Sequence, residues 1–288
     1  MFDTVPTLQC GARALRLDRP RIMAIVNVTP DSFSDGGHHA GTQAALAHCE
    51  QLIREGVDIL DIGGESTRPG SPAVPLADEL ARVLPVVREA VRLGVPVSVD
   101  TYKPEVMRAV LDLGADIVND IWALRRGDAL RAVAAHPACG VCLMHMHRDP
   151  QTMQVAPMAG DVLPVVADFL RQQADALRAL GVAPQRITLD PGIGFGKTVA
   201  QNFSLLARQR ELLSLGYPLL AGWSRKSSLG AVTGRDHPVE RVSASVAAAV
   251  LAVERGARIV RVHDVRETVD ALRVWQAMQD EDAAASRG

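Results

Sequence analysis

The chain has 288 residues, of which 48% are hydrophobic and 22% charged, and its formal net charge at pH 7 is -2. This length and hydrophobic content allow a large buried core, and the charge excludes the strongly basic surface typical of proteins that bind nucleic acid or anionic membranes. An anionic small-molecule ligand would therefore have to be met by local Arg and Lys side chains.

The N-terminal sequence MFDTVPTLQCG has no cationic segment followed by an apolar run, so no signal peptide is expected. The longest apolar run, Val246 to Val253, is too short to span a bilayer. The four cysteines suit a reducing compartment, in which they remain thiols. We therefore expect a cytoplasmic protein.

Two of the cysteines, Cys139 and Cys142, have the C-x-x-C spacing of redox and zinc sites, and His145 and His147 follow closely. The segment GVCLMHM, however, has the pattern of a strand, in which residues three apart face opposite sides and cannot readily share a metal ion. The pattern favours a packed strand over a zinc site.

The remaining elements are predicted from hydrophobic periodicity. Residues Leu8 to Arg19 can form a short hairpin around Cys10-Gly11, and from Ile22 onward short Val- and Ile-rich runs alternate with amphipathic stretches of helical length. The expected strands are Ile22 to Asn27, Ile59 to Gly63, Pro96 to Asp100, Ile117 to Asp120, Gly140 to Met144, Ile187 to Asp190, Pro218 to Ala221 and Ile259 to Val262. The expected helices are Thr42 to Glu55, Leu76 to Leu93, Pro104 to Leu113, Asp128 to His136, Asp161 to Leu180, Gln201 to Leu215, Val239 to Arg255 and Val265 to Gln279.

Eight βα units in an unbroken series, with strands apolar enough for burial on both faces, predict an α/β fold: a (β/α)8 TIM barrel with a short N-terminal hairpin. We expect residues 1–280 to form a single domain and residues 281–288 a disordered tail. A doubly wound open sheet is the main alternative. It would place a glycine-rich phosphate turn after the first strand, where this chain has Asn27-Val-Thr-Pro-Asp.

Polar side chains stand at or just after the end of every expected strand, which is the catalytic end of a TIM barrel. They are Asn27, Asp61, Asp100, Asn119, Asp120, His145, Asp190, Ser224 to Lys226, Arg261 and His263, with Glu65 to Arg68 after the second strand. An Asp after a strand is often only the N-cap of the next helix, and Asp100 and Asp120 could each be no more than that. N-capping does not explain the charged residues Arg68, Asp190, Lys226 and Arg261. Because such charges are costly to bury without partners, the set as a whole predicts a ligand site.

The glycine-rich stretch Pro191 to Thr198, PGIGFGKT, ends like a P-loop, but Pro191 stands where that motif requires its first glycine. The stretch does not match the dinucleotide fingerprint G-x-G-x-x-G either. A loop that brings Phe195 and the backbone close to a flat ligand fits the pattern better.

With these residues in view, the chain resembles dihydropteroate synthase over nearly its whole length. The similar segments are NVTPDSFSDGG (27–37), DIGGESTRPG (61–70), VSVDT (97–101), Asn119-Asp120, LMHM (143–146), PQTMQ (150–154), DPGIGFGK (190–197), GWSRKS (222–227) and RVHD (261–264). So many separate motifs in the same order are a specific signal. The chain departs from the family pattern at His147-Arg148-Asp149, where a Gln-Gly pair is expected.

The resemblance implies that 7,8-dihydropterin-6-ylmethyl diphosphate and 4-aminobenzoate condense to 7,8-dihydropteroate, with loss of diphosphate, in tetrahydrofolate biosynthesis. A pterin presents a row of N–H donors and a carbonyl acceptor. The acceptors Asp100, Asn119 and Asp190 can bind its aminopyrimidine edge. Lys226 can donate to its carbonyl and ring nitrogen, and the resemblance adds Met144 to the same slot.

Loss of diphosphate requires charge stabilisation on oxygen. By the family's motif, Asn27 would be a ligand of Mg²⁺, and Arg68, Arg261 and His263 would hold the diphosphate. The catalytic residues would then be Asp100, Lys226, Arg261 and His263. The resemblance implies an SN1-like path in which diphosphate leaves before the amine attacks, so that no covalent nucleophile is needed.

The second substrate, 4-aminobenzoate, requires a pocket beside the pterin slot and loops that exclude water. The candidates for the 4-aminobenzoate pocket are Phe33, Thr67, Arg68 and Phe195, with Ser227 near the carboxylate. We expect the loops at residues 29–37 and 66–70 to close over the bound diphosphate and exclude water. The resemblance also suggests a homodimer through the last helices, where the Ala-rich run Ser243 to Val253 could pack. A helix buried within the chain would explain this run equally well.

Other interpretations of the same residues remain open. A pterin-dependent methyltransferase shares the barrel and the pterin slot but would not need the diphosphate clamp. An aldolase-type enzyme would use Lys226 as a Schiff-base amine, which the neighbouring Arg225 disfavours. A non-catalytic paralogue would bind a pterin without turnover, and the complete set of site residues disfavours it.

Overall fold

A computed structural model describes residues 6–28, 37–66 and 70–285 of the chain. Within these residues, eight parallel strands form a closed barrel in the order β10-β3-β4-β5-β6-β7-β8-β9. The strands are β3 (Arg21–Asn27), β4 (Ile59–Gly63), β5 (Val97–Asp100), β6 (Ile117–Asp120), β7 (Gly140–Met144), β8 (Ile187–Asp190), β9 (Leu219–Ala221) and β10 (Ala257–Val262). The predicted (β/α)8 fold is confirmed.

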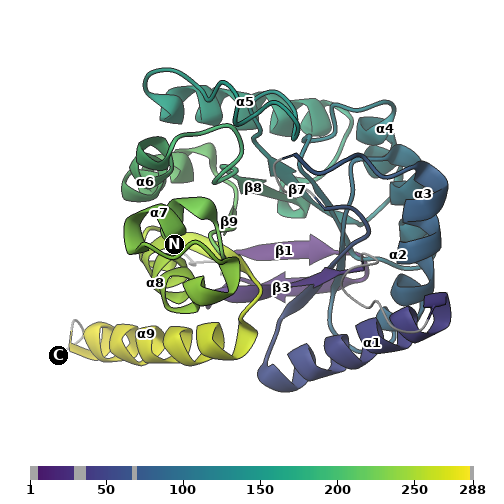
Figure 1. Cartoon of the computed structure of the whole chain (residues 1–288), viewed down its shortest axis with the longest axis horizontal. Coiled ribbons are helices and arrows are strands. Elements are labelled where there is room, and N and C mark those ends of the chain that lie inside the picture. The colour runs from purple at the N-terminus through teal and green to yellow at the C-terminus, as the bar shows by residue number, and fades with distance from the viewer. Residues whose placement is uncertain (1–5, 29–36, 67–69, 286–288) are drawn as a thin grey trace.

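Helices surround the barrel as an outer ring (Figure 1). They are α1 (Gly37–Glu55), α2 (Leu76–Ala90), α3 (Pro104–Asp112), α4 (Ala129–Ala135), α5 (Val162–Ala179), α6 (Val199–Ala207), α7 (Ser227–Thr233), α8 (Val242–Glu254) and α9 (Val265–Ala285), with short 3-10 turns η2 (Pro184–Arg186), η3 (Gln209–Leu215) and η4 (Pro238–Arg241). None of the helices in the described part of the chain is both long and apolar enough to cross a membrane.

Several elements differ from the sequence-based expectation. The predicted helix over 239–255 is divided into the 3-10 turn η4 and helix α8. The predicted helix over 201–215 is divided into α6 and the tighter turn η3, in which the buried Gln209 donates to the carbonyl of Ala252. Helix α7 was not expected, since seven residues containing Gly230 give no clear helical period. Helix α9 continues to Ala285, so the first residues of the expected disordered tail are helical, in keeping with the high helix propensity of alanine at 283–285.

The barrel has an inner and an outer apolar layer, as expected for short strands buried on both faces. Met23, Ile59, Ile117, Cys142 and Ile259 belong to one inner cluster near the beginnings of their strands. Alternate residues on the same strands pack outward against the helices, as Val118 and Val141 do.

The position of the two spaced cysteines follows from this layering. Cys142 belongs to the inner cluster and Cys139 to an outer one, and both are free thiols. Within the described residues, no group of three or more His, Cys, Asp or Glu side chains is placed to hold a metal ion. The predicted packed strand is confirmed as β7, whose five residues are all buried.

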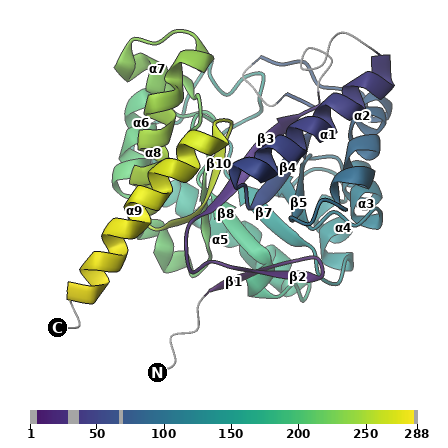
Figure 2. The same ribbon diagram turned by 90° about the horizontal axis from the view of Figure 1, so that it is seen from below.

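The hairpin formed by β1 (Thr7–Cys10) and β2 (Arg13–Arg16) lies across one end of the barrel (Figure 2). Leu8, Cys10 and Leu17 pack against the inner cluster at the beginnings of the barrel strands. Gly11 makes the tight turn with a φ of +59°, and a Cβ there would lie 2.5 Å from Asp116 Oδ1. Because the hairpin covers the N-terminal end of the barrel, a ligand must enter at the C-terminal end.

Candidate active site

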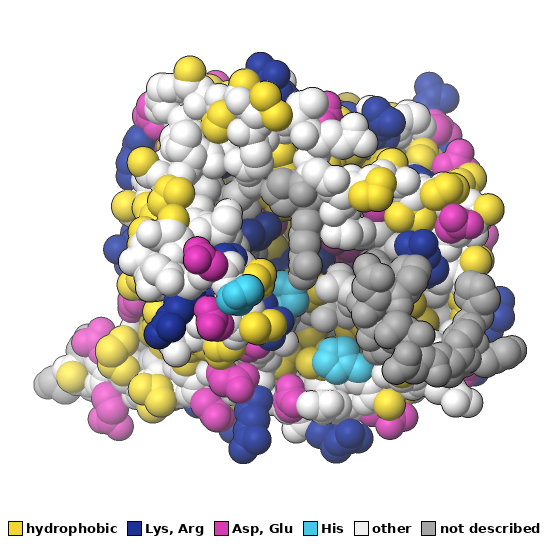
Figure 3. Space-filling model, viewed as in Figure 1, with side chains coloured by type: hydrophobic (Ala, Val, Ile, Leu, Met, Phe, Trp, Pro, Cys, Tyr) yellow, Lys and Arg dark blue, Asp and Glu magenta, His cyan; other side chains and the backbone are white. Residues whose placement is uncertain are grey.

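The predicted polar residues are brought together at the C-terminal ends of the strands. Asn27 is the register partner of Gly63, Gly63 of Asp100, and Asp100 of Asn119, so these residues of β3 to β6 lie at one level. Gly63 has no side chain to fill the space between Asn27 and Asp100. Figure 3 shows the molecule from the side of Figure 1, with a hollow near the centre of this face and basic and histidine side chains around it.

The partly buried Arg261 of β10 is the centre of a hydrogen-bond network with buried acidic partners. Its Nε donates to Asp61 Oδ2 at 2.6 Å and its Nη2 to Asp100 Oδ2 at 2.7 Å. The Nδ2 of Asn119 donates to the same Asp61 oxygen at 3.1 Å. Asp61 is fully buried, and its Oδ1 has no hydrogen-bond partner among the described residues. The Asp61 carboxylate therefore orients both Asn119, which is predicted to bind the pterin, and Arg261, which is predicted to bind the diphosphate.

The sequence alone predicts Asp61 only as a polar residue within a strand and assigns it no role. The signal was present, because it is the one charged residue in the run ILDIG, whose five residues are all buried. A buried carboxylate requires a partner of opposite charge or several hydrogen bonds. The sequence could not indicate that the partner stands 200 positions away, at Arg261.

Burial controls the protonation of the two strand-end carboxylates. Burial raises the pKa of Asp100 to about 7, against the opposing effect of Arg261, and the charges of Asp61 and Asp120 raise it further. Burial also raises the pKa of Asp190, while the N–H of Gly192 and the ammonium of Lys226 lower it. Near neutral pH, Asp100 can therefore accept hydrogen bonds or carry a proton.

The two predicted acidic N-caps have different structures. Asp120 accepts hydrogen bonds from the backbone N–H groups of Trp122 and Leu124, so it shapes the turn after β6 and is not turned toward Arg261. Asp100 instead binds Arg261, and the N-cap of α3 is Lys103. The helix-capping interpretation is wrong for Asp100, whereas Asp120 does have a backbone-capping role, although in a turn that precedes α4.

An apolar slot lies beside this network. Phe195 packs in a buried cluster with Ile121, Met144, Met146 and Met153. Met144 is the register partner of Asp190 on the adjacent strand. The Nζ of Lys226 lies 4.3 Å from the centroid of the Phe195 ring, a distance at which an ammonium is attracted to the ring face. Flat apolar surface and polar edge groups are thus adjacent.

The remaining predicted residues lie at the rim or outside the described chain. The Nδ1 of His263 lies 3.0 Å from Ser224 Oγ, and Ser224 also accepts from the backbone N–H of His263, which fixes the ring above β10. Ser227 is exposed at the first residue of α7. Phe33, Thr67 and Arg68, and the loop over 29–36, lie outside the described residues.

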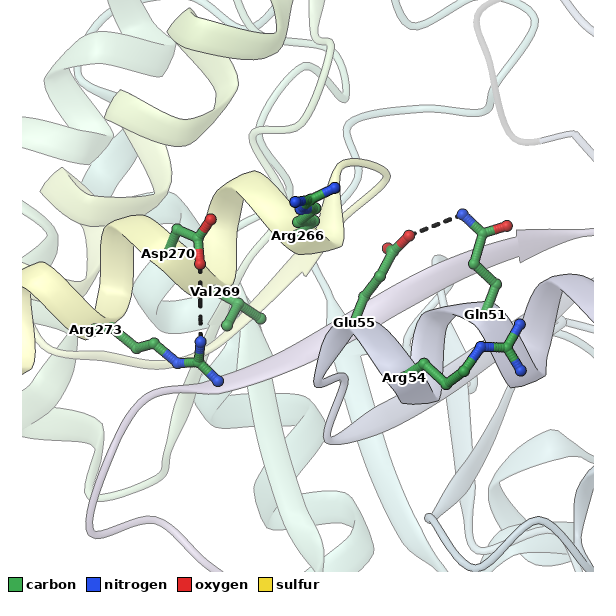
Figure 4. A pocket seen from close by; sticks show the side chains of 7 residues that line it. All are labelled: Gln51, Arg54, Glu55, Arg266, Val269, Asp270 and Arg273. Atoms are coloured by element: carbon green, nitrogen blue, oxygen red, sulfur yellow. Dashed lines mark hydrogen bonds and ion pairs between the residues drawn. The ribbon is translucent and has the colours of Figure 1, made fainter.

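Two cavities have different relations to this site. One of about 260 Å³ opens at the rim of the same face, between the loops after β4, β5 and β6, and Tyr102, Trp122 and Arg126 line it. A larger groove of about 510 Å³ lies between the outer helices α1 and α9, where the side chains drawn are mostly charged (Figure 4). Gln51 there donates to Glu55, and Arg273 pairs with Asp270 at 3.8 Å. The groove contains none of the strand-end residues, so the network around Arg261 is the better candidate.

A metal ion would meet oxygen donors here. Asn27 offers an amide oxygen at the end of β3, and the described residues provide no cage of three His, Cys, Asp or Glu side chains. Mg²⁺ suits such a donor set, because it is commonly held by one or two protein oxygens together with water and substrate phosphates.

Comparison with known proteins decides the family. The family described as "Pterin binding enzyme" matches residues 23–263. Dihydropteroate synthase of Neisseria meningitidis serogroup B is 51% identical over 94% of this chain and 96% of its own. The structure of Xanthomonas albilineans dihydropteroate synthase with 4-aminobenzoic acid is 54% identical, with a TM-score of 0.90, over 96% of this chain and 99% of that one.

This chain belongs to the dihydropteroate synthase family. The Burkholderia cenocepacia dihydropteroate synthase complexed with 7,8-dihydropteroate is also similar, with 52% identity and a TM-score of 0.88 over 98% of this chain and 99% of that one. The dihydropteroate synthase resemblance is confirmed, and the comparisons give no support to the methyltransferase or the non-catalytic paralogue.

Proposed function

We propose that the chain condenses 7,8-dihydropterin-6-ylmethyl diphosphate with 4-aminobenzoate to give 7,8-dihydropteroate and diphosphate, as a transferase of folate synthesis, with the network around Arg261 as its centre. The observation that carries the assignment of residues is the convergence of Asp100, Asn119 and Asp190 beside two cations, Arg261 and Lys226. A pterin edge offers adjacent N–H donors and one carbonyl, and these five side chains supply the complementary acceptors and donors.

The pterin would lie with its aminopyrimidine edge on the three acceptors. Asp190 already accepts a hydrogen bond from the backbone N–H of Gly192 through Oδ1, at 2.7 Å, and this contact sets the orientation of its carboxylate. Lys226 would donate to the pterin carbonyl and ring nitrogen, and Met144 would pack against the flat ring. Asp100, with its raised pKa, is placed to share a proton with a pterin ring nitrogen.

The diphosphate would be bound at the open side of the same network. Two of the guanidinium nitrogens of Arg261 are used by Asp61 and Asp100, and its Nη1 makes no hydrogen bond to a described residue. Arg68 and His263 would add positive charge and hydrogen bonds. Mg²⁺ bound at Asn27 would neutralise developing charge on the leaving oxygens. The 4-aminobenzoate would lie between Phe33, Thr67, Arg68 and Phe195, with Ser227 near its carboxylate.

Further parts of the proposal concern the chain as a whole. We infer that residues 1–280 act as one pterin-binding domain, since the hairpin packs directly beneath the barrel core. A cytoplasmic location is supported by the four free cysteines, which suit a reducing compartment. We also infer a homodimer through the last helices, because α8 and α9 expose the large apolar side chains Leu251, Val274 and Met278. Sedimentation of the purified chain tests the dimer, and a Leu251→Glu, Val274→Glu double variant should sediment as a monomer.

The assay for the proposed reaction follows release of diphosphate. The purified protein with the pterin diphosphate and Mg²⁺ should release diphosphate only when 4-aminobenzoate is added, in equal amount to the dihydropteroate formed. Release that does not depend on 4-aminobenzoate would contradict the proposal. Borohydride treatment should leave no adduct at Lys226, which tests the Schiff-base alternative directly.

A further inference from the structure

One buried cation near the site has no role in the proposed reaction. The chain contains 31 Lys and Arg residues, of which only Lys103, Lys197 and Lys226 are lysines. Lys197 is 2% exposed and lies in the loop between β8 and α6. Lysine differs from arginine in being a compact charge with three donors that point in different directions. Its use at a buried point therefore suggests a local need for a small cation.

The surroundings of Lys197 are a cage of acceptors. Its Nζ donates to the carbonyl of Gly192 at 2.8 Å and to the carbonyl of Phe195 at 3.2 Å. The carbonyl of His145 lies at 3.4 Å and the Nδ1 of the same residue at 3.0 Å. Burial lowers the pKa of His145 to about 2, so its ring is neutral and can accept through Nδ1. The ammonium thus ties the end of β7 to both halves of the loop over 192–197.

This loop lies so close to the residue after β7 that there is no room for a side chain at Gly192. Gly192 has a φ of +69°, and a Cβ there would lie 1.8 Å from the carbonyl oxygen of His145. The N–H of Gly194 donates to Asn202 Oδ1, and Gln154 donates to the carbonyl of Gly194. Backbone approach of this kind leaves carbonyl oxygens facing one another. The Lys197 ammonium compensates their repulsion.

The loop in turn determines the position of two predicted ligand-binding residues. The ring of Phe195 lies beneath the ammonium of Lys226, with 4.3 Å between Nζ and the ring centroid. A Cβ on Gly194 would lie 3.3 Å from Lys226 Cδ, so the backbone of the loop also contacts the Lys226 stem. Displacement of the loop would therefore move Phe195 and Lys226 together.

We propose that Lys197 is a positioning residue, whose ammonium acts as an internal cation that holds the loop over 192–197 and thereby sets Phe195 against Lys226. Its effect on binding of the pterin and 4-aminobenzoate rests on the proposed function, whereas its effect on the position of Lys226 does not. The ammonium lies beneath the loop and contacts backbone oxygens, so it acts on substrates through Phe195 and Lys226.

Simple stabilisation of the fold is the alternative role for Lys197. Burial lowers the pKa of Lys197 to about 7, with the charge of Asp190 opposing and that of Lys226 assisting this shift. The protonated form is therefore held at a cost in desolvation. A purely stabilising role predicts that loss of the charge changes the melting temperature and leaves Lys226 in place.

Side-chain NMR distinguishes the two roles, because a sample labelled with ¹³C at lysine Cε gives signals from only three residues. Protons above the face of an aromatic ring are shifted upfield. In Lys197→Met, which keeps the apolar stem and removes the charge, the Hε signal of Lys226 should move downfield toward the position of a free lysine. An unchanged Lys226 signal in a folded Lys197→Met protein would overturn the proposal. Lys103→Arg is the matched control and should leave the Lys226 signal unmoved.

A second measurement uses the unaltered protein, in case Lys197→Met does not fold. The same labelled sample is titrated from pH 6 to pH 10. The Lys226 signal should shift as the Lys197 signal titrates, and Lys197 titration without any change at Lys226 would overturn the proposal. Neither measurement requires turnover, so a protein that fails to make dihydropteroate can still support or refute the positioning role.

Kinetics connect the positioning role to the reaction. Lys197→Met should raise the KM for 4-aminobenzoate by about tenfold or more with a smaller change in kcat. In Lys197→Ala, added ethylammonium should lower this KM again by entering the vacated cage. Tetramethylammonium, which has no N–H, should not. Unchanged KM values, or equal rescue by both cations, would count against the ammonium as the element that holds the loop.

Discussion

Arg261 and Asp61, which stand 200 positions apart in the sequence, are joined by a hydrogen bond of 2.6 Å across the mouth of the barrel. Arg261 lies on β10 and Asp61 on β4, with β3 between them. The two side chains therefore reach over one strand inside the barrel. The same guanidinium also binds Asp100, so its orientation is set from two directions before any ligand arrives.

Loss of the Asp61 charge should weaken the contact that orients the Arg261 guanidinium. In Asp61→Asn, Arg261 loses one charge-assisted hydrogen bond, so affinity for the pterin diphosphate should fall by ~1.5–3 kcal/mol. Calorimetric titration with the pterin diphosphate measures this loss of affinity. Asp116→Asn is the matched control, because Asp116 binds the backbone N–H of Val97 at the other end of the barrel. That variant should lose stability and keep its affinity.

Asp190→Asn should weaken pterin binding by ~1.5–3 kcal/mol, the contribution of one hydrogen bond to a charged acceptor. The predicted change is in the dissociation constant of a pterin without diphosphate, measured by calorimetry. Asp120→Asn is the comparison, since Asp120 is as buried but serves the turn at Trp122 and Leu124. If both variants weaken pterin binding equally, the assigned role of Asp190 is wrong.

Arg261→Ala should separate the two parts of the first substrate. The variant should bind the pterin diphosphate weakly and release diphosphate slowly, while a pterin that lacks diphosphate still binds. Arg261→Lys should not restore full activity, because an ammonium cannot reproduce the fork that reaches both Asp61 and Asp100. Equal loss of affinity for the two pterins would contradict the division of roles.

Lys197 should make stability depend on pH with a defined sign. The pKa of Lys197 is lowered to about 7 from its ordinary value of 10.5, so between these values the unfolded chain binds more protons than the folded one. Stability of the native protein relative to Lys197→Met should therefore rise as the pH increases from 7 toward 10.5. The neighbouring groups His145, Asp190 and Lys226 are common to both proteins. Urea unfolding of both proteins at pH 7 and pH 9 measures the difference in their free energies of unfolding. A difference that falls as the pH rises would refute the prediction.

Much of the fold and most of the site were predictable because strands alternate between two faces. Counting in twos from the inner residues Met23, Ile59 and Ile117 leads to Asn27, Asp61 and Asn119 on the same face. The same count from Ile259 leads to Arg261. The same count places Asp120 on the other face, and in the structure Asp120 accepts a hydrogen bond in the turn after β6.

The parts that sequence reasoning missed depend on contacts between distant segments. The contact between Asp61 and Arg261 joins two strands, whereas the cage around Lys197 forms where the segments after β7 and β8 meet. No local sequence pattern indicates either contact. In the sequence, Lys197 stands out only as the lysine of the stretch PGIGFGKT, which does not match the P-loop motif. Its rarity was a usable signal, since all three lysines of the chain stand near the C-terminal ends of strands.

The most direct test of the account is diphosphate release by the purified chain with Mg²⁺ and the pterin diphosphate, measured with and without 4-aminobenzoate. We predict release that requires 4-aminobenzoate, stops when EDTA removes Mg²⁺, and is accompanied by an equal amount of dihydropteroate. Absence of 4-aminobenzoate-dependent release from the folded protein with both substrates and Mg²⁺ present would contradict the synthase assignment.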